Sequence, residues 1–154
     1  MEIRKAGPHD VEAVAALVER AYERYVPRIG RRPAPMDADY EALVEAEAVF
    51  VLGAPDVIGV IVLRPAPDHL LIENVAVGPD RQRDGLGRRL LAFAERTALG
   101  EGLRELRLYT NEAMTENIEL YRSLGWEEYD RRAGNRFARV YFRKRIGDGP
   151  EPSP

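Results

Sequence analysis

Residues 75–91 read VAVGPDRQRDGLGRRLL and contain the most informative pattern in the sequence. Its first three residues, Val75 to Val77, complete an apolar strand pattern, and a glycine-containing turn follows them. From Leu86 onward, apolar residues recur at the spacing of one helix face. The first turn of such a helix exposes backbone N–H groups without intrahelical partners, and the helix dipole adds partial positive charge. Because Gly85 and Gly87 leave the backbone accessible, the stretch predicts a turn that binds a phosphate or pyrophosphate.

The spacing within this turn limits the kind of phosphate site. Arg83 and Arg88 add positive charge beside the glycines. A Rossmann fingerprint needs a third small residue, but Leu90 occupies that position. A P-loop needs a Gly-Lys-Ser/Thr sequence, which the stretch lacks. The pattern that is present is Q-x-x-G-x-G, formed by Gln82, Gly85 and Gly87.

Outward from this stretch, hydrophobic periodicity predicts a mixed α/β fold. Strands are expected at residues 2–5, 48–52, 57–63, 70–77, 103–109, 126–132 and 137–145. Helices are expected from Pro8 to about Tyr25, from Asp37 as a cap to about Glu47, from about Leu86 to Leu99, and at 115–124. Residues 27–36 are expected to form a loop, and Gly134-Asn135 to form a turn. The strand–helix–strand order over 70–109 implies a parallel pair, while the hairpins imply antiparallel strands.

Length and composition exclude several function classes. The 154 residues predict one domain, over 1–146, with a disordered tail at 147–154. Because cysteine is absent and histidine occurs twice, thiolate chemistry and a multi-histidine metal site are excluded, so no metal is expected. With 23 basic and 26 acidic residues, the charge gives nucleic-acid binding little support. The apolar runs are too short for a membrane span and the start is not a secretory leader, so we expect a soluble, cytoplasmic protein.

A second pattern lies downstream, where residues 109–126 read YTNEAMTENIELYRSLGW. The pattern predicts a short helix that ends in Leu-Gly and is followed by an aromatic residue. Together with Q-x-x-G-x-G, this pattern closely resembles the signature motifs of the GNAT superfamily. Its members are acyl-coenzyme A-dependent N-acetyltransferases. The resemblance extends over about residues 1–146 and implies a twisted, mostly antiparallel sheet of about seven strands with helices on both faces. It also implies acetyl-CoA as the co-substrate.

The resemblance implies roles for particular residues. The strands at 70–77 and 103–109 would splay apart, which would free the backbone of Val75, Ala76 and Val77 to pair with the pantetheine arm. The pyrophosphate would be held, with Gln82, by the backbone amides of Arg83, Asp84, Gly85, Leu86, Gly87 and Arg88. Tyr121 would lie beside the thioester sulfur and protonate the leaving thiolate. The family's usual asparagine contact falls on Met114, so Asn111 and Asn117 are the candidates to replace it.

The chemistry expected from these residues is direct attack by an amine in a ternary complex. The sequence has no cysteine, and neither of its serines lies in a nucleophile motif, so a covalent acyl-enzyme is not expected. Glu73 is the candidate general base, acting through water, because burial in an apolar strand can raise its pKa. Tyr109 is the reserve candidate. The structural alternatives are that Glu73 pairs with an arginine across the sheet, that Tyr121 is only a core residue, and that Asn117 is only a solvated helix residue.

The sequence says less about the part of the site that binds the acceptor substrate. The expected acceptor is an amine of a small molecule or a peptide. In the resembling family, the stretch with Arg28, Arg31 and Arg32 lies where the acceptor groove is walled, and Asp37 and Asp39 beside it can attract an amine. A non-catalytic acyl-CoA-binding module is the alternative function. The strands at 126–145 can also pair across a homodimer.

Overall fold

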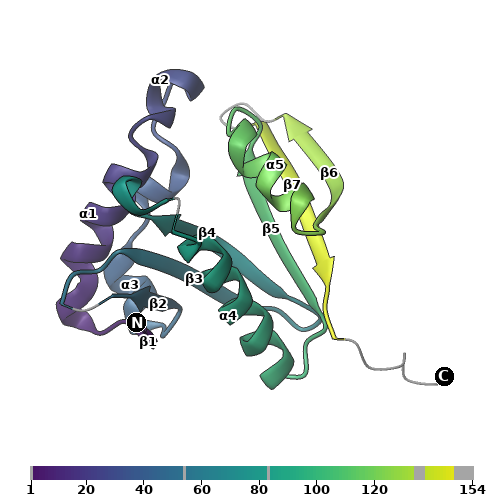
Figure 1. The fold of residues 1–154 in the computed structure, drawn as a ribbon, viewed down its shortest axis with the longest axis horizontal. Helices are drawn as coiled ribbons and strands as arrows, with labels where there is room; N and C mark the ends of the chain where they lie inside the picture. The colour runs from purple at the N-terminus through teal and green to yellow at the C-terminus, as the bar shows by residue number, and fades with distance from the viewer. Residues whose placement is uncertain (1, 54, 83, 134–137, 148–154) are drawn as a thin grey trace.

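The computed structural model describes residues 2–53, 55–82, 84–133 and 138–147, and Figure 1 shows their arrangement. The strands are β1 (Ile3–Lys5), β2 (Val49–Leu52), β3 (Gly59–Pro65), β4 (Leu70–Val77), β5 (Glu105–Asn111), β6 (Glu127–Ala133) and β7 (Ala138–Arg145). The α-helices are α1 (Val11–Tyr22), α2 (Tyr25–Ile29), α3 (Tyr40–Glu45), α4 (Leu86–Gly100) and α5 (Thr115–Ser123). Three 3-10 turns are η1 (Pro8–Asp10), η2 (Ala34–Asp37) and η3 (Pro79–Arg81).

The strands form one seven-stranded sheet in the order β1-β2-β3-β4-β5-β7-β6. All neighbours are antiparallel except β4 and β5, which run parallel and are joined through α4. This arrangement confirms the predicted mixed, mostly antiparallel sheet with one central parallel pair. The predicted turn at Gly134-Asn135 and all of the predicted tail except Gly147 lie outside the described residues.

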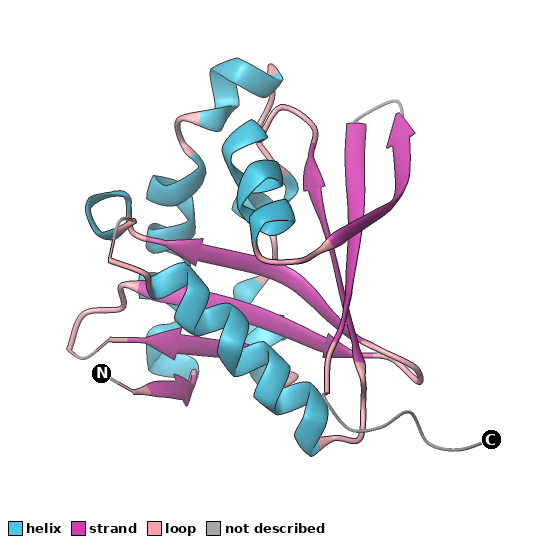
Figure 2. Cartoon of the chain, turned by 45° about the vertical axis from the view of Figure 1, so that its right-hand side comes forward, coloured by secondary structure: helices cyan, strands magenta, loops and turns pink. Residues whose placement is uncertain are grey.

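Helices cover both faces of the sheet and enclose a core on each. Apolar residues of α4 and α5, including Leu90 and Ile118, pack on one face with Ile61, Leu106 and Phe142. On the other face, α1 and α3 pack on the sheet through residues that include Val14, Leu17, Val18, Tyr40 and Val44. Figure 2 shows α4 and α5 in front of the sheet and α1 behind it. The prediction of helices on both faces is therefore confirmed.

A β-bulge in β4 interrupts the alternation of the strand. Val62 of β3 pairs with Asn74 and Leu63 pairs with Ile72, which leaves Glu73 as the extra residue. As a result Ile72 faces the core under α4, whereas Asn74 turns toward the side of α1 and bonds to Tyr22 there.

The bulge also marks the place where the parallel pair separates. Pairing between β4 and β5 covers Leu70, Leu71 and Ile72 and ends there, one residue before the bulge. β4 then continues alongside β3 to Val77, while β5 follows β7 to Asn111. Figure 1 shows the two strands diverging from this point. The opening between them, the β4–β5 opening, is the splay that the family resemblance implies.

Two predictions around the second helix are wrong. Residues 27–36 are not all loop, because α2 and η2 lie partly within them. Pro27 is compatible with α2 because it is the third helical residue, where the N–H needs no intrahelical acceptor. Asp37 does not cap α3; the cap is Asp39, whose Oδ1 accepts a hydrogen bond from the Ala42 amide at 3.0 Å. Asp37 instead pairs with Arg32 at 2.9 Å.

The described helices are short compared with a membrane-spanning helix. α4, the longest of them, has 15 residues. Across the described ranges, no helix combines the length and the hydropathy that a membrane span requires.

Candidate active site

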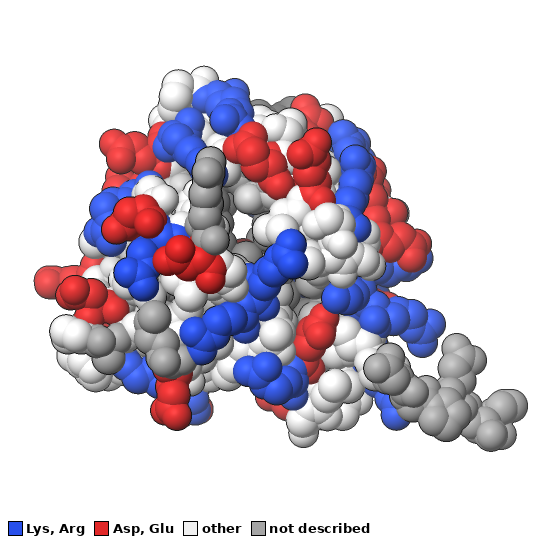
Figure 3. All heavy atoms as spheres, in the orientation of Figure 1, with Lys and Arg blue, Asp and Glu red and all other residues white. Residues whose placement is uncertain are grey.

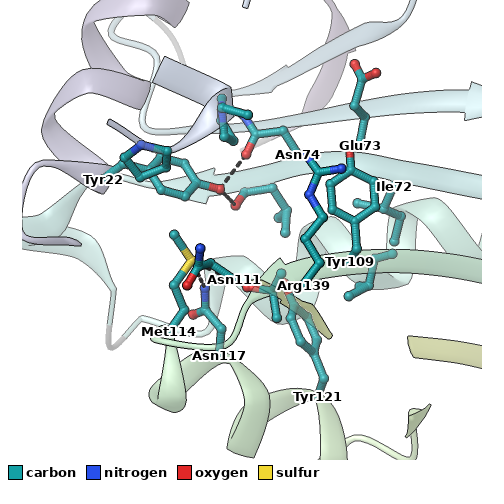
Figure 4. A pocket seen from close by; sticks show the side chains of 16 residues that line it. Tyr22, Ile72, Glu73, Asn74, Tyr109, Asn111, Met114, Asn117, Tyr121 and Arg139 are labelled. Atoms are coloured by element: carbon teal, nitrogen blue, oxygen red, sulfur yellow. Dashed lines mark hydrogen bonds between the residues drawn. The ribbon is translucent and has the colours of Figure 1, made fainter. Parts of the chain in front are cut away.

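A cavity lies within the β4–β5 opening, and we call it the central cavity (Figure 4). Side chains from β4, β5, α1 and α5 meet there with residues 33–35, which belong to the segment between α2 and α3. We call that segment, residues 30–39, the linker. The cavity is lined by Tyr22, Pro33, Ala34, Pro35, Ile72, Glu73, Asn74, Val75, Leu108, Tyr109, Thr110, Asn111, Met114, Asn117, Tyr121 and Arg139.

A second space, the phosphate-side groove, runs from the central cavity toward the start of α4. It is lined by the end of β4, the end of α1, one side of α5 and the start of α2, and it reaches Gln82, Gly87 and Leu91. Four residues line both spaces, namely Tyr22, Val75, Asn117 and Tyr121. The surface in Figure 3 is hollowed where the end of β4 faces α5 in Figure 1. The two spaces are therefore neighbours on one path through the opening.

The start of α4 leaves its backbone donors without a side-chain cap. Gly85 occupies the cap position with φ of 74°, in the left-handed region, and the first helical acceptor is its carbonyl, bonded by the Arg89 amide. A Cβ added at Gly85 or Gly87 would meet no heavy atom within 4 Å, so the space beside this backbone is open. Donors, dipole and open space together make an anion cradle.

The side chains of the Q-x-x-G-x-G turn differ in their surroundings. Gln82 lines the phosphate-side groove and donates to the Val77 carbonyl at 3.4 Å. Leu86 is buried in the core, so only its backbone can face a ligand. Asp84 pairs with Arg81 at 3.2 Å, and Arg88 is exposed. Arg83 lies outside the described residues.

Tyr121 brings a phenol to the junction of the two spaces. Its ring packs against Trp126 and Phe142, with centroids 5.9 and 5.8 Å away, and only 6% of the residue is exposed. Burial raises the pKa of Tyr121 well above its usual range, with a smaller contribution from Tyr25. The hydroxyl therefore stays protonated at neutral pH. The ring is a core residue, as the structural alternative requires, and its position also gives the phenol access to the cavity.

Glu73 lies at the other end of the central cavity from Tyr121 (Figure 4). The bulge places it there, between Ile72 and Asn74, which both pair with β3. It is half-buried, and its negative charge raises the pKa values of two neighbouring phenols, those of Tyr40 and Tyr109. In both tyrosines burial is the larger cause of the shift. Glu73 thus faces the linker side of the opening.

The three residues near the start of α5 have different neighbours. Asn117 lines both the central cavity and the phosphate-side groove, whereas Asn111 lines only the former. Asn111 Oδ1 accepts from the Ala113 amide at 2.9 Å. Met114 is buried, and its sulfur accepts from Thr110 Oγ1 at 3.4 Å and Asn117 Nδ2 at 3.7 Å.

A buried hydrogen-bond network behind the cavity was not predicted from the sequence. Tyr22 Oη donates to Asn74 Oδ1 at 2.5 Å, and Asn74 Nδ2 donates to Tyr40 Oη at 3.1 Å. Tyr40 Oη in turn donates to the Pro35 carbonyl at 2.6 Å. The network ties β4, α1 and α3 to the linker. The only signal in the sequence was a polar residue, Asn74, in an apolar strand.

A third space, the linker-side cavity, continues from the central cavity past Glu73 and beneath the linker. Its lining is largely apolar and consists of Ala34, Pro35, Ala38, Asp39, Tyr40, Ala42, Leu43, Val62, Glu73, Asn74 and Tyr109. The expectation that this segment walls a groove agrees with that position. Two arginines hold this region in place: Arg32 of the linker bonds both Glu19 oxygens at 2.8 Å, and Arg28 of α2 bonds Glu116 at 2.6 Å.

With this geometry established, the sequence model of the Acetyltransferase (GNAT) family matches residues 12–126. The chain belongs to that family. The match includes the Q-x-x-G-x-G turn, the bulged strand β4 and Tyr121. The GNAT resemblance inferred from the two motifs is thus confirmed.

Solved structures share this fold, and one further acetyltransferase matches part of the sequence. The ribosomal-protein-S18-alanine N-acetyltransferase of Escherichia coli aligns at a TM-score of 0.74 and 21% identity, over 97% of this chain and 96% of that one. The PaiA N-acetyltransferase of Thermoplasma acidophilum, solved with coenzyme A, aligns at 0.78 and 17% identity, over 94% and 98%. The probable N-acetyltransferase 14 of Xenopus tropicalis is 32% identical over 81 residues, 51% of this chain, and the matched part is 39% of that protein's length.

Proposed function

We propose that this GNAT protein is an acetyl-CoA-dependent N-acetyltransferase that acylates a primary amine of a small molecule or peptide. The observation that carries the proposal is the sequence of spaces through the β4–β5 opening. It begins at the anion cradle of α4, passes Tyr121 and ends at Glu73 under the linker. A donor and an acceptor can therefore meet from opposite sides. Family membership supports acyl transfer, and the PaiA structure contains coenzyme A in the same fold.

The residues of the phosphate-side groove fit coenzyme A. The uncapped amides of Gly85 to Arg88 suit a pyrophosphate, and the open space at both glycines gives it room. Beyond Ile72 the β5-facing edge of β4 has no strand partner among the described residues, so Val75 to Val77 are available to a pantetheine arm. Asn117 is a better candidate than Asn111 for the extra contact because it lines this groove. When bound, acetyl-CoA supplies an activated thioester.

Tyr121 is proposed as the general acid. A phenol whose pKa is raised by burial holds its proton at neutral pH and can donate it to a developing thiolate. Its ring packing fixes the hydroxyl at the junction where the groove meets the central cavity. A backbone N–H at Val77 is proposed to stabilise negative charge on the carbonyl oxygen.

Glu73 is proposed as the general base, acting through water. It faces the linker side, from which an amine would approach, and it lies at the other end of the cavity from Tyr121. The amine nitrogen forms a bond to the acetyl carbon while the carbon–sulfur bond breaks. One proton leaves the amine toward Glu73, and one passes from Tyr121 to the sulfur. Side-by-side binding of both substrates supplies much of the rate in such a reaction.

The Tyr121→Phe variant tests this proposal. The ring packing is retained, so acetyl-CoA affinity measured by calorimetry should change less than threefold. Turnover of an amine panel, followed by thiol release, should fall about 100-fold or more because the acid is lost. Tyr129→Phe is the matched control, since Tyr129 is exposed on β6 and should leave turnover unchanged. Tight acetyl-CoA binding without turnover of any amine by the unmodified protein would instead identify a non-catalytic acyl-CoA-binding module.

Other expectations stay predictions. These are the cytoplasmic location, the single domain over residues 1–146, and a homodimer formed through β6 and β7. Among the described residues, no three His, Asp or Glu side chains gather as a metal site would need.

A further inference from the structure

The two walls of the β4–β5 opening carry opposite charges on the linker side of Tyr121. Glu73 projects from the bulge on β4, and Arg139 projects from β7 on the other wall. Both residues line the central cavity; in Figure 4 Arg139 lies at the Tyr109 ring, and the Glu73 carboxylate extends away from them. The Arg139 guanidinium stacks on the Tyr109 ring, with Cζ 4.4 Å from its centroid.

The Tyr109 phenol senses both charges at once. Burial is the main cause of its raised pKa, the Arg139 charge lowers that pKa, and the Glu73 charge raises it. A negative and a positive group therefore act on one side chain from within one small space. A ligand at Tyr109 would therefore lie in the field of both charges.

The β7 side carries a second donor. Asn111 on β5 lies directly opposite Arg139 in the antiparallel register. Because Asn111 Oδ1 accepts from the Ala113 amide, its Nδ2 group remains to donate toward the cavity that it lines. A guanidinium has five N–H donors, so Arg139 can stack on a ring and hydrogen-bond in the same position. A guanidinium beside an amide suits a carboxylate.

The linker-side cavity provides an apolar site next to these charges. Ala38, Leu43 and Val62 line it together with Pro35 and the Tyr40 ring. Asp39 lines the same cavity, and its Oδ1 caps α3. The charged pair and the apolar cavity meet at Glu73 and Tyr109, which line both spaces.

We propose that the acceptor is an apolar α-amino acid with a free carboxylate. Its amine faces Glu73, its carboxylate bonds to Arg139 and Asn111, and its side chain occupies the linker-side cavity. This inference rests on the proposed acetyl transfer and narrows its acceptor class. The transfer itself is unchanged: the α-nitrogen gains the acetyl group and loses one proton.

The test compares L-leucine with leucinamide and 3-methylbutylamine, which keep the amine and the apolar body but lack the carboxylate. L-Leucine should be acetylated with a kcat/KM at least about 30-fold above either analogue, because only it makes the charge-assisted contact. Arg139→Gln should remove that advantage while changing kcat/KM for 3-methylbutylamine less than threefold. Arg143→Gln is the matched control, because Arg143 lies on the same strand and also stacks on a tyrosine, Tyr129, at 5.4 Å. It should preserve the leucine preference.

A binding measurement separates failure of this inference from failure of the proposed function. L-Leucine should bind the coenzyme A-saturated protein in calorimetry, and Arg139→Gln should weaken that binding about tenfold or more. Arg139-dependent binding without acetylation would support the ligand class and overturn the acetyl transfer. Equal turnover of leucine and the amines, preference for peptides, or an equal loss on all substrates in Arg139→Gln would overturn the ligand class. In that case Arg139 only supports the Tyr109 ring.

Discussion

The phosphate-side groove and the linker-side cavity lie on two sides of the same opening, yet they are built from different parts of the chain. The groove presents backbone, in the uncapped first turn of α4 and the unpaired edge of β4. The linker-side cavity presents side chains, and its wall is held by the Tyr22–Asn74–Tyr40–Pro35 network. A backbone site suits an invariant ligand, whereas a side-chain site can select an acceptor. The comparison predicts that substitutions can impair acetyl-CoA binding and acceptor binding separately.

The largest effect is expected at the start of α4, with Gly87→Asp. A carboxylate in the first helical turn interacts favourably with the dipole, and replacing glycine adds helix propensity, so thermal stability should hold or rise. The same charge faces the site proposed for the pyrophosphate. Acetyl-CoA affinity should therefore fall about 100-fold or more, equivalent to about 2.7 kcal/mol, in a calorimetric titration.

Gly100→Ala is the control for this change. Gly100 closes the same helix, and a Cβ there meets no heavy atom within 4 Å. This variant should bind acetyl-CoA as the unmodified protein does. If Gly87→Asp kept its affinity for acetyl-CoA, the anion cradle would have to be placed elsewhere.

The next-largest effect is expected at Asn74, in the network that holds the wall of the linker-side cavity. Asn74→Ala leaves the buried Tyr22 and Tyr40 hydroxyls without their shared partner, which should lower the free energy of unfolding by about 2–3 kcal/mol in a urea titration. The linker loses part of its support, so KM for the acceptor should rise about tenfold. Acetyl-CoA affinity should change less than threefold.

Thr110→Val gives the comparison for Asn74→Ala. Thr110 is a buried polar residue on β5, but its hydroxyl makes only a bond to sulfur, so its loss should cost less than about 1 kcal/mol. If Asn74→Ala impaired acetyl-CoA binding as much as acceptor binding, the two sides would not be independent.

The same contrast explains how much of the site could be predicted from the sequence. The groove depends on local backbone geometry, and Gln82, Gly85 and Gly87 encode that geometry within six residues. The strands were also predictable, because their alternation and turns are local signals. The predicted strand at 70–77 agrees with β4 at both ends.

The network and the bulge could not be predicted in this way. Tyr22, Tyr40 and Asn74 meet across 34 and 52 residues of chain, and no local pattern marks that meeting. The bulge at Glu73 depends on the register against β3, which a single strand does not define. The loop prediction for residues 27–36 rests on their richness in Pro, Arg and Gly, whereas the first turn of α2 accommodates Pro27.

A pH test probes a region away from both sides of the opening. Both oxygens of Asp10 accept from Arg4, at 2.8 and 2.9 Å, and this pairing lowers the pKa of Asp10 from 3.8 to about 2. Because the folded-state pKa is depressed, the stabilisation is fully present above pH 4 and is lost as pH falls from about 4 to about 2. The loss should be about 2 kcal/mol in urea titrations across that range.

Asp10→Asn should remove this contribution at pH 7 and flatten the pH dependence between 4 and 2. Because Asp10 lines neither the groove nor the cavities, acetyl-CoA affinity and acceptor KM at pH 7 should be unchanged. An altered KM would mean that stability and acceptor binding are coupled through the sheet.

The smallest effect is expected at a surface ion pair between α2 and α5, which both line the phosphate-side groove. Arg28 of α2 bonds Glu116 of α5 at 2.6 Å, and Tyr25 donates to the same carboxylate at 3.4 Å. Both charged side chains are nearly half exposed, at 42% and 49%, so water screens the attraction. A double-mutant cycle with Arg28→Ala and Glu116→Ala should give a coupling below about 1 kcal/mol, which 1 M salt should remove. A coupling of about 2 kcal/mol or more that persists in salt would contradict this expectation and show that the ion pair locks α2 and α5 together.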